Sequence, residues 1–66
     1  MQETIDKAMD SIAFTVSDLQ EALKQAKDMA FARPEGPSLG DKALATYLCD
    51  CLDAARKLQN DLARIS

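Results

Sequence analysis

The stretch "RPEGPSLGDK" (residues 33–42) contains both prolines and both glycines of this 66-residue chain. The residue before Pro34 is pushed out of the helical conformation, which ends any helix that precedes it. Gly36 suits the left-handed backbone of a tight turn. Ser38 followed three residues later by Asp41 is typical of a capped helix start, with Asp in place of the usual Glu. The stretch therefore predicts a sharp turn between two helices.

The sequence before this turn repeats apolar residues at alternating steps of four and three. A sustained 3.5-residue repeat is typical of a helix that packs lengthwise on another helix. We predict this helix over about residues 3–32. Its inward positions are Ile5, Met9, Ile12, Val16, Leu19, Leu23, Ala26 and Ala30.

The sequence after the turn shows the same repeat and predicts a second helix over about residues 39–65. A short connection makes two long helices antiparallel neighbours. We therefore expect one domain over residues 1–66, an all-α antiparallel two-helix hairpin. The inward positions predicted for the second helix are Leu44, Leu48, Cys51, Ala55, Leu58, Leu62 and Ile65.

The chain has more apolar residues than one hairpin can cover. A domain this short buries only about 60% of its unfolded surface and usually needs staples or partners. We expect self-association into a four-helix bundle or a higher oligomer, with a homodimer favoured. A bundle completed by a different protein is the alternative. The side chains predicted to contact a partner are Phe14, Phe31, Tyr47 and Leu52.

The two aromatic residues of the first helix have structural alternatives. Phe14 lies opposite the inward positions, so it is either a single exposed aromatic, an oligomer contact or a hot spot for a foreign partner. Phe31 stands in the last turn, where it can instead cap the end of the bundle by folding onto Leu39.

Composition narrows the classes of partner. The chain carries 11 acidic and 8 basic residues, a net charge of −3. This balance disfavours binding to a nucleic-acid duplex or to an anionic membrane surface. No apolar run approaches the roughly 20 residues of a membrane span, and the first residues lack the pattern of a signal peptide. We expect a cytoplasmic protein.

The two cysteines are expected to be reduced in that compartment. Residues two apart on a helix point to nearly opposite sides, so Cys49 and Cys51 cannot bond to each other there. We read Cys51 as a buried small side chain. Cys49 lies nearer the surface, as a free thiol or an intermolecular cross-link. A metal site would need four ligands, and we predict no metal and no cofactor.

The chain has no histidine, the commonest general base and the usual partner of a catalytic Ser or Cys. No glycine-rich cofactor motif is present either. The sequence therefore favours a non-enzymatic protein that acts by stoichiometric binding.

The functional interpretation of the bend is an anion site, because the free amides at a helix start attract anions. Arg33, Ser38, Lys42 and Thr46 lie near that end. They are the candidate ligand-binding residues.

Part of the second helix resembles the anti-CBASS sponges, small phage-encoded helical proteins that sequester the cyclic nucleotide signals of anti-phage defence. The resemblance consists of Pro37-Ser38 followed by Thr46, Leu48 and Asp50. It implies binding of a cyclic nucleotide, with Ser38 and Thr46 as the positions to carry over.

The first helix is similar to that of the helical-hairpin co-chaperones of type III secretion needle subunits. The similarity runs from Leu19-Gln20-Glu21-Ala22-Leu23 through Lys27-Asp28-Met29. Our leading expectation is a phage- or prophage-type inhibitor or regulator that sequesters a host protein or a signalling ligand. A cyclic-nucleotide sponge and a needle co-chaperone are the alternatives.

Overall fold

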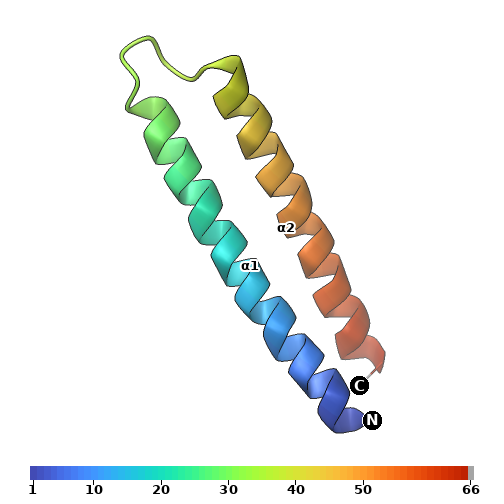
Figure 1. Ribbon diagram of the computed structural model, residues 1–66. Helices are drawn as coiled ribbons and strands as arrows, with labels where there is room; N and C mark the ends of the chain where they lie inside the picture. The colour runs from blue at the N-terminus through green and yellow to red at the C-terminus, as the bar shows by residue number, and fades with distance from the viewer. Residues whose placement is uncertain (66) are drawn as a thin grey trace.

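The computed structural model describes residues 1–65, which form two long antiparallel helices joined by a short bend (Figure 1). Helix α1 spans Gln2–Phe31 and helix α2 spans Leu39–Ile65. The predicted all-α hairpin is confirmed, and its predicted helix limits agree to within one residue. The molecule is a rod of 52 × 14 × 12 Å, and its two ends lie together opposite the bend.

The bend follows the chemistry that its residues predict. Gly36 has a φ of 82°, the left-handed conformation that glycine tolerates best. The Asp41 amide donates to Ser38 Oγ at 3.1 Å, and the Ser38 amide donates to Asp41 Oδ2 at 3.0 Å. This reciprocal pair is the predicted capping box, and it fixes the start of α2.

An ion pair closes the bend from the other side. Arg33 Nε donates to Asp41 Oδ2 at 2.7 Å, and a second guanidinium nitrogen donates to Oδ1 at 3.3 Å. The Ser38 amide and, next, the Arg33 guanidinium hold the pKa of Asp41 below its usual value of 3.8. The end of α1 is therefore tied directly to the start of α2.

The face that α1 turns toward α2 is the predicted one. All eight inward positions are buried or half-buried, whereas nearly every residue between them is exposed. Ala30 is the most buried of them. Its small side chain lies in the last turn of the helix, close to the bend.

The face of α2 differs from the prediction at alternate positions. The heptad of the sequence places Leu44, Leu58 and Ile65 against α1, but they remain 49%, 56% and 70% exposed. A set of shielded positions at steps of four and three does run along α2, but three of them lie one residue further along, at Ala45, Leu52 and Gln59. Cys49, Cys51 and Asp61 are half-buried beside this set. The residues of α2 on the α1 side are Asp41, Ala45, Leu48, Leu52, Ala55, Gln59 and Leu62.

The difference arises because two apolar heptad patterns overlap on α2, the predicted one and the one that faces α1. Leu48, Ala55 and Leu62 belong to both, so the spacing alone does not say which set of neighbours accompanies them. A single partner helix covers one stripe of this kind. In the hairpin α1 covers the stripe that contains Leu52 and leaves Leu58 in solvent.

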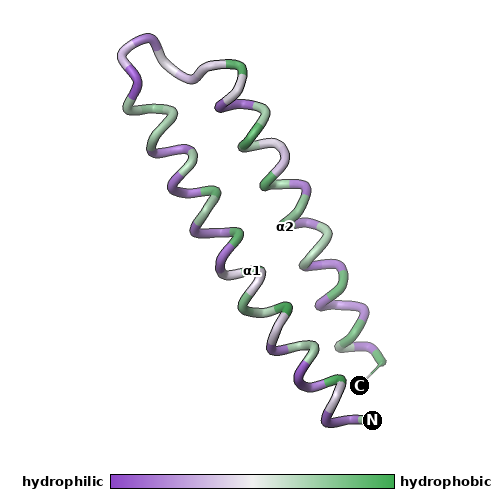
Figure 2. The backbone as a smooth tube through the Cα atoms, in the orientation of Figure 1, coloured by the Kyte–Doolittle hydropathy of each residue, from purple (hydrophilic) through white to green (hydrophobic). Residues whose placement is uncertain are grey.

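The resulting core is small. Among the described residues only Ala30, Leu52 and Ala55 are buried, and no side chain is completely enclosed. Figure 2 shows apolar residues recurring along the whole length of both helices. Much of the apolar surface of this chain is therefore left uncovered by the hairpin.

Candidate functional site

A groove runs along one side of the hairpin between the two helices. Its central part has a volume of about 400 Å³ and contains residues of both helices, with Leu23 and Leu52 at its base. A second hollow of about 320 Å³ lies nearer the bend and shares Lys27 with the first. We call the two together the basic groove. Its cations are Lys24, Lys27, Lys42 and Arg56.

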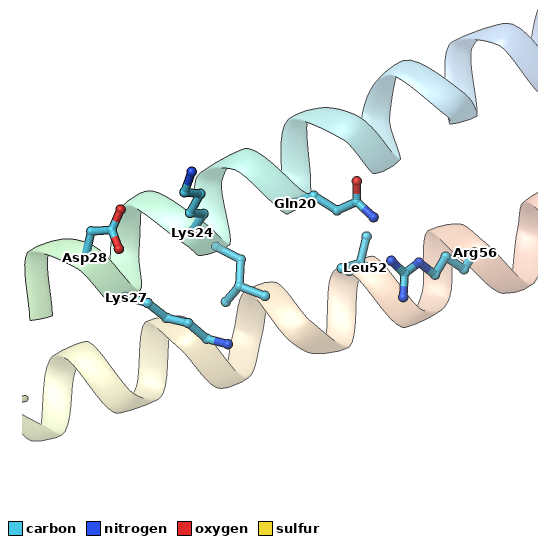
Figure 3. Close-up of a pocket in the computed structure, with 7 residues that line it drawn as sticks. Gln20, Lys24, Lys27, Asp28, Leu52 and Arg56 are labelled. Carbon is cyan, nitrogen blue, oxygen red and sulfur yellow. The ribbon is translucent and has the colours of Figure 1, made fainter. Parts of the chain in front are cut away.

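The close-up in Figure 3 shows how the central part is built. Lys27 extends from α1 across toward α2, and Gln20 and Arg56 approach each other from opposite helices on the far side of Leu52. Lys24 and Asp28 project from the side of α1 that is turned away from α2. Lys27 and Arg56 therefore lie over the apolar base, and Lys24 and Asp28 stand at its outer edge.

The groove is locally positive although the chain as a whole is acidic. It holds four of the eight basic residues, and none of these four takes part in the ion pairs of residues 1–65. Its two carboxylates are Asp28 and Asp41, and the charge of Asp41 is already matched by Arg33. The four cations are therefore balanced only by Asp28, the one groove carboxylate that has no ion pair within residues 1–65.

The base of the groove is aliphatic for most of its length. Leu23 and Leu52 form the central part, and alanines of both helices continue it toward the bend. Phe31 and Pro37 line the end of the groove at the bend. An elongated apolar base with a cationic rim matches a ligand that is itself amphipathic and anionic.

A second uncovered surface lies on α2, away from the groove. Its residues again repeat at steps of three and four, about a quarter turn around the helix from the side that faces α1. We call it the second stripe. It consists of Leu44, Tyr47, Cys51, Ala54, Leu58, Asp61 and Ile65.

The predicted partner-contact residues are distributed over three surfaces. Phe31 lines the groove, Tyr47 belongs to the second stripe, and Phe14 stands 72% exposed on the outer side of α1. The prediction that Leu52 is surplus to the hairpin is wrong, because Leu52 is only 7% exposed and packs toward α1. Its remaining surface forms part of the groove base.

The predicted ligand residues at the bend mostly have partners within the chain. Arg33 is paired with Asp41, Ser38 caps α2, and Thr46 Oγ1 donates to the Lys42 carbonyl at 3.0 Å. The Ser38 amide already binds the Asp41 carboxylate, which occupies the place that an anion would take. Only Lys42 turns to the groove.

Sequence reasoning did not single out Lys24, Lys27 or Arg56 as site residues. The available signal was positional: Lys27 and Arg56 directly follow inward positions of their helices, so both lie on the same edge of an antiparallel pair. This inference requires knowing which side of α2 faces α1, and the sequence of α2 is compatible with two such sides.

Comparison of the chain with protein-family models, with curated proteins and with solved structures gave no match. Within residues 1–65, neither helix is long and apolar enough to cross a membrane. The same residues contain no cluster of three or more potential metal ligands, and Cys49 and Cys51 are half-buried free thiols.

Proposed function

We propose that this is a small non-enzymatic protein that acts by stoichiometric binding and holds an acidic amphipathic segment of a host protein in the basic groove. The observation that carries the proposal is the set of four cations, none of them in an ion pair of residues 1–65, around an apolar base. Apolar contacts with the base would supply affinity, and the cations would select acidic partners and speed their association.

The shape of the groove supports a peptide segment. It is open to solvent, it follows the helix axes, and it is lined by both helices over more than two turns. An amphipathic helix laid into such a groove buries one apolar face and keeps its acidic residues at the rim. The completed assembly would be a three-helix arrangement with a larger core than the hairpin alone.

Within this class we propose an inhibitor or regulator of the phage or prophage type that sequesters its target. That step rests on the resemblance of Pro37-Ser38 and Thr46 to the sponge family. A cyclic-nucleotide sponge is the second candidate. It is favoured by the hollow at the bend, where Phe31 can stack on a base beside Lys27 and Lys42.

A needle co-chaperone would use the same groove for a helix of the secretion subunit. Such a client would also be held by apolar contacts. The salt dependence of binding separates this case from the leading one, because an acidic target must lose affinity as the ions screen its charges.

The groove is tested with a synthetic amphipathic helix in two versions, one with glutamates and one with glutamines on its polar face. Binding is followed by fluorescence anisotropy at low and at moderate salt. We expect the acidic version to bind more tightly and Lys27→Glu to weaken its binding by about tenfold or more. Lys7→Glu is the matched control, because Lys7 lies outside the groove and pairs only with exposed Glu3.

Equal binding of the two peptides, or equal effects of the two substitutions, would contradict an acidic target. A fluorescent cyclic dinucleotide tests the second candidate in the same assay. Saturable one-to-one binding that is lost in Phe31→Ala would favour the sponge.

A further inference from the structure

We propose that the second stripe of α2 packs against the same stripe of a second copy of the chain, with the two bends at opposite ends of the dimer. The stripe repeats at steps of three and four from Leu44 to Ile65, and six of its seven residues are apolar. In the hairpin five of its seven residues are exposed, among them Leu58 at 56% and Tyr47 at 66%, and the other two, Cys51 and Asp61, are half-buried. A repeat of this kind is what a helix presents to another helix along its length.

The surface area of the chain is larger than a compact fold of its mass would expose, and the excess matches the area of an ordinary interface. The accessible area is 5023 Å², whereas a compact monomer of 7.2 kDa is expected to expose roughly 4,100 Å². The excess is roughly 900 Å², close to the roughly 800 Å² that each partner buries in a standard-size interface. A second copy seated on one side of the rod would remove an area of this size.

The stripe is complementary to itself when it is turned end for end about Ala54. Leu44 then meets Ile65 of the second copy, and Cys51 meets Leu58, so that a small side chain faces a large one. The two Ala54 residues meet at the symmetry axis, where their small side chains allow the helices to approach closely. An interface of this kind repeats each contact twice, as two-fold symmetry requires.

The polar member of the stripe also finds a partner in this register. Asp61 of one copy comes opposite Tyr47 of the other, where the tyrosine hydroxyl can donate to the carboxylate. Asp61 keeps its ion pair with Lys57, whose Nζ lies 3.1 Å from Asp61 Oδ2. Lys57 is on the outer side of the helix. The single polar residue of the stripe therefore does not oppose its burial.

The adjoining side of α1 accommodates the same axis. Leu23 and Leu52 share one part of the groove, which places Ala22 and Ala54 at about the same height along the rod. Ala22 is exposed, and Thr15 and Met29 lie two turns away from it on either side. The two α1 helices can thus approach each other at Ala22 while the α2 helices meet at Ala54.

The opposite arrangement, with both bends at the same end, places α2 of one copy on α1 of the other. The second stripe would then cover polar residues, with Leu58 near Asp18 and Cys51 near Gln25. Burying apolar side chains against these groups leaves the polar atoms without partners and costs free energy. In the end-for-end arrangement the apolar stripes cover each other, and Asp18 of one copy lies near Gln25 of the other, so that polar groups face polar groups.

Cross-linking tests the register in a Cys49→Ser, Cys51→Ala background. After mild oxidation we expect Ala54→Cys to form a covalent dimer, because the two residues meet at the axis. Ala43→Cys, an exposed alanine on the outer face of the same helix, is the control and should stay monomeric on denaturing gels. Cross-linking of Ala54→Cys no better than of Ala43→Cys overturns the register.

Sedimentation equilibrium tests the surface itself. We expect a dimer for the unmodified chain, and a dissociation constant raised by at least about a hundredfold in Ala54→Glu, because a charge is buried without a partner. Ala43→Glu should remain dimeric. A wild-type chain that stays monomeric at a protein concentration of about 100 μM, which is about 100 times a micromolar dissociation constant, overturns the proposal. Equal masses for the two variants overturn it as well.

Discussion

Leu52 is the largest of the three buried side chains, and the small core depends on it. Replacing a buried leucine by alanine removes apolar contacts and leaves a cavity. We expect Leu52→Ala to lower the free energy of unfolding by about 2 kcal/mol or more. This is a large part of the roughly 3–5 kcal/mol that a core in so short a chain supplies. Urea denaturation followed by circular dichroism measures the loss.

Leu39→Ala is the control for this prediction. Leu39 is 85% exposed, so its truncation should change the free energy of unfolding by less than about 0.5 kcal/mol. Similar losses in the two variants would mean that Leu52 does not hold the helices together.

Asp41 gives the bend a dependence on pH. Its pKa is lowered by the Ser38 amide and by Arg33, so the folded chain binds the carboxyl proton less readily than the unfolded chain does. The stabilisation is therefore complete above the usual pKa of 3.8 and is lost as the pH falls through the lower, folded-state value. We expect the thermal midpoint of the wild type to exceed that of Asp41→Asn at neutral pH.

This advantage should shrink progressively as the pH is lowered below 3.8. Differential scanning calorimetry of both proteins between pH 6 and pH 2 measures it. A constant difference across this range would show that the ion pair and the capping bond do not form in solution.

At the scale of the helices, α1 and α2 were not equally predictable. The repeat of α1 has polar residues on most positions beside it, so one face was clearly apolar and the structure buries that face. On α2 the apolar arc is wider and fits two overlapping heptad patterns. Which of the two faces inward is decided only when α1 is in place. The chain uses Ala45 and Gln59 rather than Leu44 and Leu58. The bend was predictable because its residues act locally.

The basic groove could not be predicted for the same reason. It joins Lys27 of α1 to Lys42 and Arg56 of α2, which meet only when the two helices have a defined rotation. If the inward positions of α2 shift by one residue, the helix rotates by about 100° about its axis. Lys42 and Arg56 then no longer lie on the same edge of the hairpin as Lys27.

Introducing an aspartate on the inward side of α1 and, separately, on its outer side tests which side packs against α2. Leu19 is half-buried toward α2, and Phe14 is 72% exposed on the outer side. We expect Leu19→Asp to lower the free energy of unfolding by about 2 kcal/mol or more, because a charge replaces an apolar contact. Phe14→Asp should stay within about 0.5 kcal/mol of the wild type.

Helical ellipticity during thermal melting compares the two variants. Unchanged melting of Leu19→Asp would contradict the packing of α1 on α2. A strong effect of Phe14→Asp would instead indicate that the outer side of α1 is buried in an assembly.

At the scale of the molecule, the proposed dimer makes stability depend on concentration. When folding is coupled to association, a higher protein concentration favours the folded dimer. We expect the thermal midpoint of the wild type to rise over a hundredfold increase in concentration, and that of Ala54→Glu to stay constant. A wild-type midpoint that is independent of concentration would contradict coupled folding and association.

The same dimer would carry two basic grooves, because the groove lies on the edge of α2 that bears Lys42 and Arg56, away from the second stripe. If both proposals hold, each dimer binds two acidic peptides, and the sites are equivalent by symmetry. Native mass spectrometry with the glutamate peptide should therefore show two chains with two peptides for the wild type and one chain with one peptide for Ala54→Glu. One peptide per wild-type dimer would place the binding site across the interface between the copies, and would contradict a groove formed within each hairpin.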